Sequence, residues 1–416
     1  MLKNALKIVQ RCAGPGATLD ESHPDSDLAR VSRTPTDPTA CIADHVANMK
    51  PYQLGLTAAE ISRKSGVPEA QIIRLASNEN PFGMSPKARA AMIEAAQDIS
   101  RYPDEYGFRV AIAEKHGVSP ENVIVSGGSD ELIHTIGRSF LGQGTSAVMS
   151  DYVYMAYVTV TDSSGAQRIS VAAKDYGHDL DAMRRAIRPD TRVVWVVNPN
   201  NPTGTLLAPQ ALLGFIRTVP RHVAVVIDEA YVDYLPDHQK PDTVSWLKDH
   251  PNLVLTRTFS KIHGMAGLRI GYGLSSPQMI ATLASVRQIY SCNAPGLAAA
   301  RASLADTEFI EHCRTHNAQG LKQLTDGLHG MGLETLPAHG NFIAVRVPQT
   351  QAVYEAMLMK GIILRPLAQY HMPDYLRISV GAPEQNARVL AALNDAIDAV
   401  LDKRLFGTPA PRMQNA

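Results

Sequence analysis

Between residues 76 and 300, short apolar runs alternate with stretches of helical character. Several of these runs are apolar at every position, as expected for strands that are covered on both faces of a sheet. The gaps between the runs are long enough to hold helices, and the alternation therefore predicts an α/β domain with a mostly parallel, seven-stranded sheet. The strand candidates are Val123–Val125, Ala147–Met149, Arg168–Val171, Val193–Val197, Val223–Ile227, Leu253–Thr256 and Leu268–Tyr272.

The character of the chain changes at both ends of this region. Residues 301–405 predict a smaller α+β domain, which residues 46–75 are expected to join. Residues 12–45 are rich in Pro, Ser, Thr, Asp and Gly, so that residues 1–45 predict a flexible leader, and residues 406–416 predict a frayed tail. The helices expected in the smaller domain are Ala299–Thr315, Ala318–His329, Gln351–Lys360 and Glu384–Asp402, and its strands are Phe342–Val345 and Leu376–Ser379.

Charge and composition narrow the class of partner. Lys and Arg total 40 and Asp and Glu total 40, so no net field favours nucleic acid or an anionic membrane. No apolar run approaches the roughly 18 residues that a membrane-spanning helix needs. The four cysteines are scattered and favour neither a zinc site nor a disulfide framework. We expect a cytoplasmic protein without a metal site, whose partner is a small molecule.

Lys261 follows the apolar run Leu253–Leu255, in a turn-rich segment that also contains Ser260 and Arg269. A lone lysine is usually a solvated surface cation. Here a hydroxyl and a guanidinium that could hold a phosphate accompany it. An aldehyde cofactor that carries a phosphate needs an amine for its Schiff base and such an anchor nearby. The segment makes pyridoxal phosphate (PLP) chemistry the leading hypothesis.

A glycine-rich turn, Ser126–Glu131, follows the first predicted strand and precedes a helical stretch. Its glycines allow a tight turn, and Ser129 or Asp130 could cap the helix. The free amide groups at that helix start could bind a phosphate. The same pattern also fits an ordinary capped strand-to-helix turn.

Two further polar segments follow predicted strands. In Asn198–Gly204 two prolines exclude helix and predict a rigid loop that could aim the Asn201 amide at a ligand. A Pro-rich turn is the alternative, and the length and regularity of the motif count against it. Asp228 closes an apolar strand, where a carboxylate is costly unless it meets a cation or donor. A protonated pyridine nitrogen would serve, and Tyr231 could reach the ring's phenolic oxygen. A helix cap is the alternative for Asp228.

Two arginines, Arg365 and Arg377, interrupt aliphatic runs in the smaller domain. A guanidinium in such a position is either one half of a buried ion pair or a fork for a substrate carboxylate or phosphate. The residues alone leave both interpretations open.

Taken together, these segments resemble the fold-type I PLP-dependent aminotransferases, and among them the chain is similar to the histidinol-phosphate aminotransferase family. The likeness covers about residues 46–403. The stretches that carry it are Met49–Gln53, Leu75–Gly83, Arg101–Asp104, Asn200–Gly204, Asp228–Tyr231, Thr258–Arg269 and Leu376–Gly381.

The resemblance implies a role for individual residues. Lys261 would form the Schiff base, Asp228 would pair with the pyridinium nitrogen, and Asn201 and Tyr231 would hold the ring's phenolic oxygen. Tyr154 would lie over the ring. The residues implied to bind the cofactor phosphate are Gly128, Ser129, Asp130, Ser260, Arg269 and, from a partner subunit, Tyr102. Those implied to bind or border the substrate are Arg377, Arg365, Tyr52 and Asn80.

The implied activity is transfer of an amino group from histidinol phosphate to 2-oxoglutarate, by a homodimer with shared active sites. An aromatic amino-acid aminotransferase or an O-phospho-amino-acid decarboxylase would use nearly the same residues. Because the domain is α/β, a dinucleotide-binding oxidoreductase is the competing class, but no G-x-G-x-x-G follows an early strand. A non-catalytic binding protein would have no use for Lys261.

Overall fold

The computed structural model describes residues 38–47, 49–51 and 55–405. The chain divides into two compact units, residues 1–52 and 53–416, which are described separately. In the first unit a 3-10 turn, η1 (Pro38–Cys41), and a short helix, α2 (Asp44–Ala47), are described. The predicted leader up to residue 37, the predicted tail and Tyr52 lie outside the described residues.

The second unit contains the seven-stranded sheet, in the order β2-β8-β7-β6-β5-β3-β4. β3 pairs with β4 and β5, β5 with β6, and β6 with β7, all in parallel, and β8 is antiparallel to both of its neighbours. The prediction of a mostly parallel sheet is confirmed. The strands are β2 (Val123–Ser126), β3 (Ser146–Ser150), β4 (Gln167–Val171), β5 (Thr191–Val197), β6 (Ala224–Asp228), β7 (Leu253–Thr258) and β8 (Gly271–Leu274).

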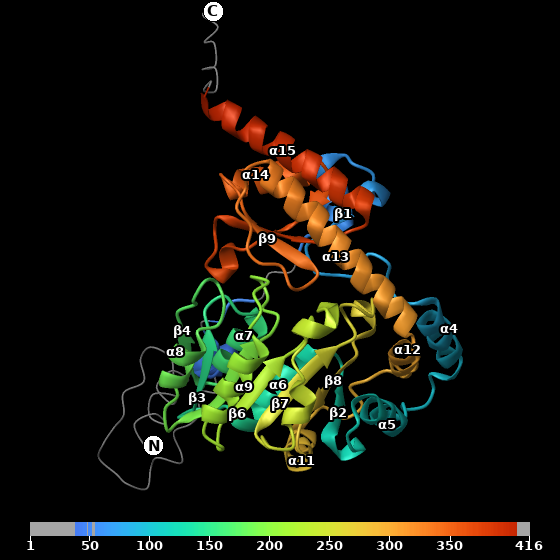
Figure 1. Ribbon diagram of the computed structural model, residues 1–416, viewed down its shortest axis with the longest axis vertical. Helices are drawn as coiled ribbons and strands as arrows, with labels where there is room; N and C mark the ends of the chain where they lie inside the picture. The colour runs from blue at the N-terminus through green and yellow to red at the C-terminus, as the bar shows by residue number, and fades with distance from the viewer. Residues whose placement is uncertain (1–37, 48, 52–54, 406–416) are drawn as a thin grey trace, which may run out of the picture. The chain divides into compact units, whose positions relative to one another are not determined.

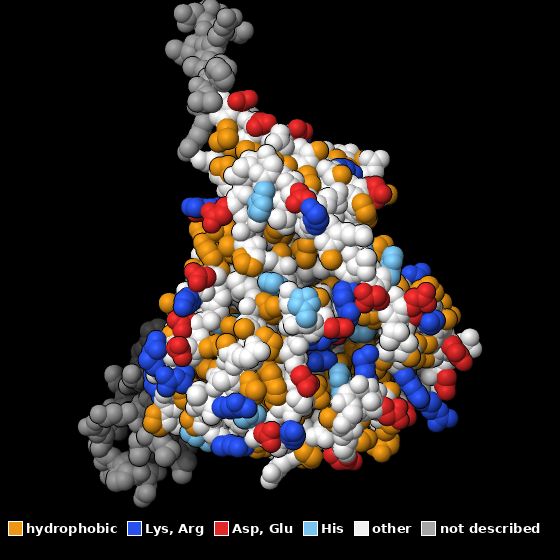
Figure 2. Space-filling view, in the orientation of Figure 1, with side chains coloured by type: hydrophobic (Ala, Val, Ile, Leu, Met, Phe, Trp, Pro, Cys, Tyr) orange, Lys and Arg blue, Asp and Glu red, His pale blue; other side chains and the backbone are white. Residues whose placement is uncertain are grey.

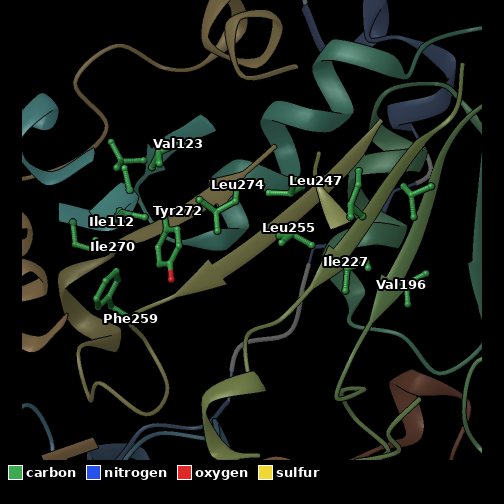
Figure 3. Close-up of a cluster of buried hydrophobic side chains, with 14 of the residues drawn as sticks. Ile112, Val123, Val196, Ile227, Leu247, Leu255, Phe259, Ile270, Tyr272 and Leu274 are labelled. Atoms are coloured by element: carbon green, nitrogen blue, oxygen red, sulfur yellow. The ribbon is translucent and has the colours of Figure 1, made fainter. Parts of the chain in front are cut away.

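The interior strands have continuous apolar stretches because both of their faces are covered. In β6, Val225 and Ile227 belong to one buried cluster, and Ala224 and Val226 belong to the cluster on the opposite face. Successive side chains of a strand point to opposite faces, so a strand between two helical layers must be apolar at every position. Figure 3 shows the first of these clusters, with Ile227, Leu255 and Tyr272 among its members.

Helices form the two covering layers. Side chains from α6 (Ser129–Phe140), α7 (Met155–Ser163) and α11 (Pro277–Val286) contribute to one cluster. The opposite cluster takes side chains from α4 (Pro86–Ala95), α5 (Glu105–His116), α8 (Leu180–Arg185), α9 (Pro209–Thr218) and α12 (Ala294–Ala305). A short helix, α10 (Thr243–Trp246), precedes β7.

A third buried cluster lies mainly in the C-terminal part of the unit. Its antiparallel sheet has the order β11-β12-β9, and a separate parallel pair joins β1 to β10. Figure 1 shows α13, α14 and α15 gathered around β9. The strands are β1 (Ile73–Arg74), β9 (Phe342–Arg346), β10 (Ile362–Ile363), β11 (Arg365–Pro366) and β12 (Tyr375–Ser379), and the helices are α3 (Ala58–Ser65), α13 (Thr307–Gly330), α14 (Thr350–Met359) and α15 (Pro383–Leu405).

Three expected element boundaries were wrong. The expected helix Ala299–Thr315 is interrupted at Asp306, whose backbone is not helical and whose carboxylate accepts a 3.0 Å hydrogen bond from Lys87. The expected break before Ala318 does not exist, because Asn317 stays helical and donates to the Gly340 carbonyl. The expected strand Leu268–Tyr272 begins only at Gly271, since Arg269 adopts a left-handed backbone with φ of 55°.

The face of the molecule in Figure 2 carries charges of both signs. Figure 2 shows basic and acidic side chains intermixed over the face in view. Among the described residues, no helix combines the length and the apolar character required to cross a membrane. The proposed domain limits at residues 45, 75, 300 and 405 remain predictions, and residue 300 lies within α12.

Candidate active site

The predicted functional residues of the large sheet follow the carboxyl ends of its parallel strands. Asp228 ends β6, Lys261 follows β7, Asn201 follows β5, and Gly128 follows β2. Ligands of open α/β sheets bind at this edge because the loops there converge. The sheet therefore brings Gly128 and Lys261 to the same edge, although they are 133 residues apart in the sequence.

Lys261 lies at this edge, three residues after the end of β7. Its Nζ donates to the Ser77 carbonyl at 3.1 Å and lies 5.7 Å from the centre of the Tyr231 ring. Burial, reinforced by the positive charge of Arg377, lowers the pKa of Lys261 to about 8, from 10.5 for an ordinary lysine. At pH 7 about a tenth of the amine is therefore neutral and nucleophilic, far more than for an ordinary lysine.

Asp228 is a buried carboxylate, 4% exposed, with neutral partners. The Tyr157 hydroxyl donates to its Oδ2, and the Ala230 amide donates to its Oδ1 at 2.9 Å. Burial raises the pKa of this carboxyl, against the effect of both hydrogen bonds. A carboxylate in such a place gains most from a cation brought beside it.

Tyr231 is buried against Phe342, with ring centres 5.2 Å apart. Burial raises the pKa of its phenol to about 12, so the phenol keeps its proton at neutral pH. The phenol oxygen accepts a 2.9 Å hydrogen bond from the Asn78 side chain.

Arg377 reaches this site from β12. It donates to the Asn201 Oδ1 at 2.6 Å and to the Ala76 carbonyl at 2.7 Å, and its guanidinium carbon lies 5.2 Å from the centre of the Phe342 ring. Arg365 stands directly opposite Arg377 in the antiparallel pair of β11 and β12. The residues alone left an ion pair or an anion fork open for Arg377, and its hydrogen bonds to Asn201 and Ala76 both go to neutral oxygens.

An anion cradle lies at the start of α6. Gly128 is the N-cap, with φ of 93°, and supplies no side-chain acceptor to the amides of the first turn, which Ser129 and Asp130 begin. A Cβ at Gly128 would collide with the Arg269 guanidinium. Arg269 also donates to the Ser260 hydroxyl at 3.4 Å. Backbone donors at a helix N-terminus beside an arginine and a serine are suited to a phosphate.

The remaining predicted residues lie in different settings. Tyr154 is the N-cap of α7, edge-on to Tyr157. Asn80 directs its amide to the Ile262 carbonyl at 2.7 Å, which ties its loop to the residue after Lys261. Tyr102 is 75% exposed and stacks on Tyr290 with ring centres 4.0 Å apart.

The sequence reasoning missed Tyr157 and Asn78. Tyr157 occurs in a mostly apolar helical stretch, where an aromatic residue is ordinarily part of the core. Asn78 stands beside the predicted Asn80 in the same loop. The available signal was that a tyrosine and an asparagine occur among buried positions. The polar end of such a side chain requires a hydrogen-bond partner.

Comparison with known proteins decides the family. The family model for class I and II aminotransferases matches residues 70–393. The chain belongs to this aminotransferase family. The match decides against the dinucleotide-binding oxidoreductase.

Two relatives of this chain are histidinol-phosphate aminotransferases. It is 45% identical over 353 residues to histidinol-phosphate aminotransferase 1 of Dechloromonas aromatica, which covers 85% of this chain and 98% of the relative. It is 44% identical over 355 residues to the histidinol-phosphate aminotransferase of Methylobacillus flagellatus, covering 85% of this chain and 96% of the relative.

Among solved structures, the aminotransferase is similar to histidinol-phosphate aminotransferase from Sinorhizobium meliloti in complex with pyridoxal-5'-phosphate. The TM-score is 0.79 at 27% identity, and the match covers 86% of this chain and 98% of the other. The α/β architecture is accordingly that of a fold-type I aminotransferase, as the sequence predicted.

Proposed function

We propose that this aminotransferase uses PLP to transfer the amino group of histidinol phosphate to 2-oxoglutarate, as a step of histidine biosynthesis. The observation that carries the proposal is a lysine with a lowered pKa that shares one sheet edge with a buried carboxylate. The names of the relatives supply the choice of amino donor.

The residues of this edge fit PLP group by group. The uncapped start of α6, with Arg269 and Ser260, suits the phosphate. The Asp228 carboxylate, held by neutral donors, suits a protonated ring nitrogen. Tyr231 and Asn201 would hold the ring's phenolic oxygen, and Tyr154 would lie over the ring. The Lys261 amine suits the aldehyde.

Each residue then has a defined task. When bound, PLP supplies an aldehyde carbon that exchanges amines and a ring that withdraws electrons from the substrate's α-carbon. Lys261 Nζ, neutral in part at pH 7, would accept the α-proton and return it as a general base and then acid. Asp228 would keep the ring nitrogen protonated. Arg377, with Arg365 opposite, would bind the anionic groups of donor and acceptor in turn.

A panel of single half-reactions tests the choice of donor. We expect histidinol phosphate to convert bound PLP into pyridoxamine phosphate faster than aromatic amino acids do. O-phospho-amino acids should give no carbon dioxide. If an aromatic amino acid reacts and histidinol phosphate does not, the proposed donor is wrong although the cofactor assignment stands.

The pKa of Lys261 predicts a pH profile for cofactor capture. Only the neutral amine attacks an aldehyde, so the capture rate of PLP by the apo chain should rise about tenfold from pH 6 to 7 and level off above about pH 8. The rate is measured from the absorbance of the bound cofactor near the edge of the visible range. Arg377→Leu removes a nearby positive charge and should move the midpoint upward. A rate that keeps rising to pH 10 would refute the lowered pKa.

We further propose a homodimer in which Tyr102 enters the partner's site. An exposed apolar surface supports it: Tyr102 and its stacking partner Tyr290 are accompanied by other large exposed apolar side chains, namely Ile99, Tyr106 and Ile289. Large exposed apolar groups of this kind mark association surfaces.

Complementation between two damaged subunits tests the shared site. We expect Tyr102→Ala and Lys261→Ala to regain activity when they are mixed and allowed to exchange subunits, because one of the two sites in the mixed dimer is then intact. Mixing Asp228→Ala with Lys261→Ala is the matched control and should regain nothing, since both residues belong to one subunit. Equal recovery in both mixtures, or in neither, contradicts the assignment of Tyr102.

A further inference from the structure

In the described part of the chain, the Tyr231 hydroxyl has one hydrogen-bond partner, the Asn78 side chain. Asn78 is 1% exposed, and its Nδ2 donates to the phenol oxygen at 2.9 Å. An amide nitrogen can only donate, so the phenol oxygen acts as the acceptor in this contact. The phenol's own proton is thereby left for a different acceptor.

The orientation of the Asn78 amide is fixed by Ser379, two residues after Arg377 on β12. The Asn78 backbone amide donates to the Ser379 Oγ at 2.9 Å, and that hydroxyl donates to the Asn78 Oδ1 at 3.0 Å. Because the serine proton is directed to Oδ1, the other end of the amide, Nδ2, faces Tyr231. Two elements from different parts of the chain thus specify one hydrogen-bond direction.

The backbone of Asn78 is also fixed, by its conformation and by a hydrogen bond to its carbonyl. Its φ is 56°, in the left-handed region that asparagine tolerates better than most residues. The Asn341 side chain donates to the Asn78 carbonyl at 3.0 Å. A buried polar network in which each member has a partner is rigid, and it can hold a side chain in one orientation.

We propose that Asn78 is a positioning residue that turns the Tyr231 hydroxyl proton toward the cofactor's phenolic oxygen. The inference rests on the proposed function and deepens it. A donor behind the phenol oxygen prevents that proton from rotating back into the protein. It also makes the phenol a better donor on its other side, because hydrogen bonds in a chain polarise one another.

A double-mutant cycle between Asn78 and Tyr231 separates positioning from plain structural support. Asn78→Gly removes the donor and tolerates the positive φ. Its affinity for PLP should fall about tenfold when Tyr231 is present, the value of one good hydrogen bond. In the Tyr231→Phe background the same change should have almost no effect. Spectroscopic titration of the apo chains with PLP measures both affinities.

A second readout reports on the phenol itself. A hydrogen-bond donor to the anionic ring oxygen favours the deprotonated form of the nitrogen that joins Lys261 to the cofactor. Loss of that donor should therefore move the pH midpoint of the visible absorbance band upward. Asn78→Gly should cause this shift only with Tyr231 present. Asn78→Asp, nearly the same shape but able to accept from the phenol, should shift the midpoint at least as far.

The outcomes are distinct. Equal losses of affinity in both backgrounds would show that Asn78 only supports the fold, and wild-type behaviour of Asn78→Asp would show that the phenol proton already points at Asn78. Either result overturns the proposal. If the wild-type chain itself acquires no visible band with PLP, the proposed function fails first, whatever the variants do.

Discussion

Lys261→Ala is expected to slow amino transfer from histidinol phosphate by about 10⁴-fold or more. The side chain is asked to hold the cofactor covalently and to carry the substrate's α-proton, and a positioned acid–base group alone is worth about 10² to 10⁴ in rate. Its amine is prepared for both tasks by burial, which lowers its pKa to about 8. Single-turnover formation of pyridoxamine phosphate is the measurement.

Two controls show that this variant is still folded: its binding of PLP through the phosphate site and its stability. The Ser260, Arg269 and Gly128 cradle does not depend on the lysine side chain, so PLP should still bind, without the covalent bond. Circular dichroism and thermal unfolding should match the wild type. Turnover within tenfold of the wild type would remove Lys261 from the chemistry.

Asp228→Asn is expected to slow the same half-reaction by about 10² to 10⁴-fold. The amide keeps the size of the carboxylate and can accept from Tyr157, but it cannot balance a positive ring nitrogen. Breaking a buried charge pair costs about 3–5 kcal/mol, which corresponds to this range of rates. Single-turnover rates in Asp228→Asn and Asp228→Glu measure the effect.

The two variants separate charge from shape. Asp228→Glu retains the charge in a longer side chain and should recover part of the lost rate. If Asp228→Asn retains full activity, the carboxylate is a structural partner of Tyr157 and the Ala230 amide, as its hydrogen bonds alone would allow.

The sequence predicted the large domain well because its signals are strong and local. In β5 the residues Val193–Val197, and in β6 the residues Ala224–Ile227, are apolar at every position, and coverage on both faces explains such runs. Placing Asp228 and Lys261 at ends of these strands was enough to predict that they share an edge, because parallel strands end together.

Elements set by long-range contacts could not be predicted. The alanine-rich run before Asp306 contains no local signal that the helix ends there. The partner of the Asp306 carboxylate is Lys87, which lies more than two hundred residues earlier. The start of β8 at Gly271 follows from the left-handed backbone of Arg269, which a sequence of ordinary helix and strand formers does not indicate.

The same limit applies to the site. Asn78 and Ser379 are separated by 301 residues, and no period or motif links them. Asn80 was the more prominent asparagine of its loop, yet its amide contacts the Ile262 carbonyl rather than Tyr231. Which asparagine meets the phenol is settled by how the loop packs against β12.

Borohydride reduction of the purified chain with PLP, followed by peptide mass spectrometry, tests the central claim most directly. The account predicts one reduced cofactor adduct, on the peptide that contains Lys261, and none on that peptide in Lys261→Ala. Absence of any adduct, or an adduct on a different lysine, would contradict it.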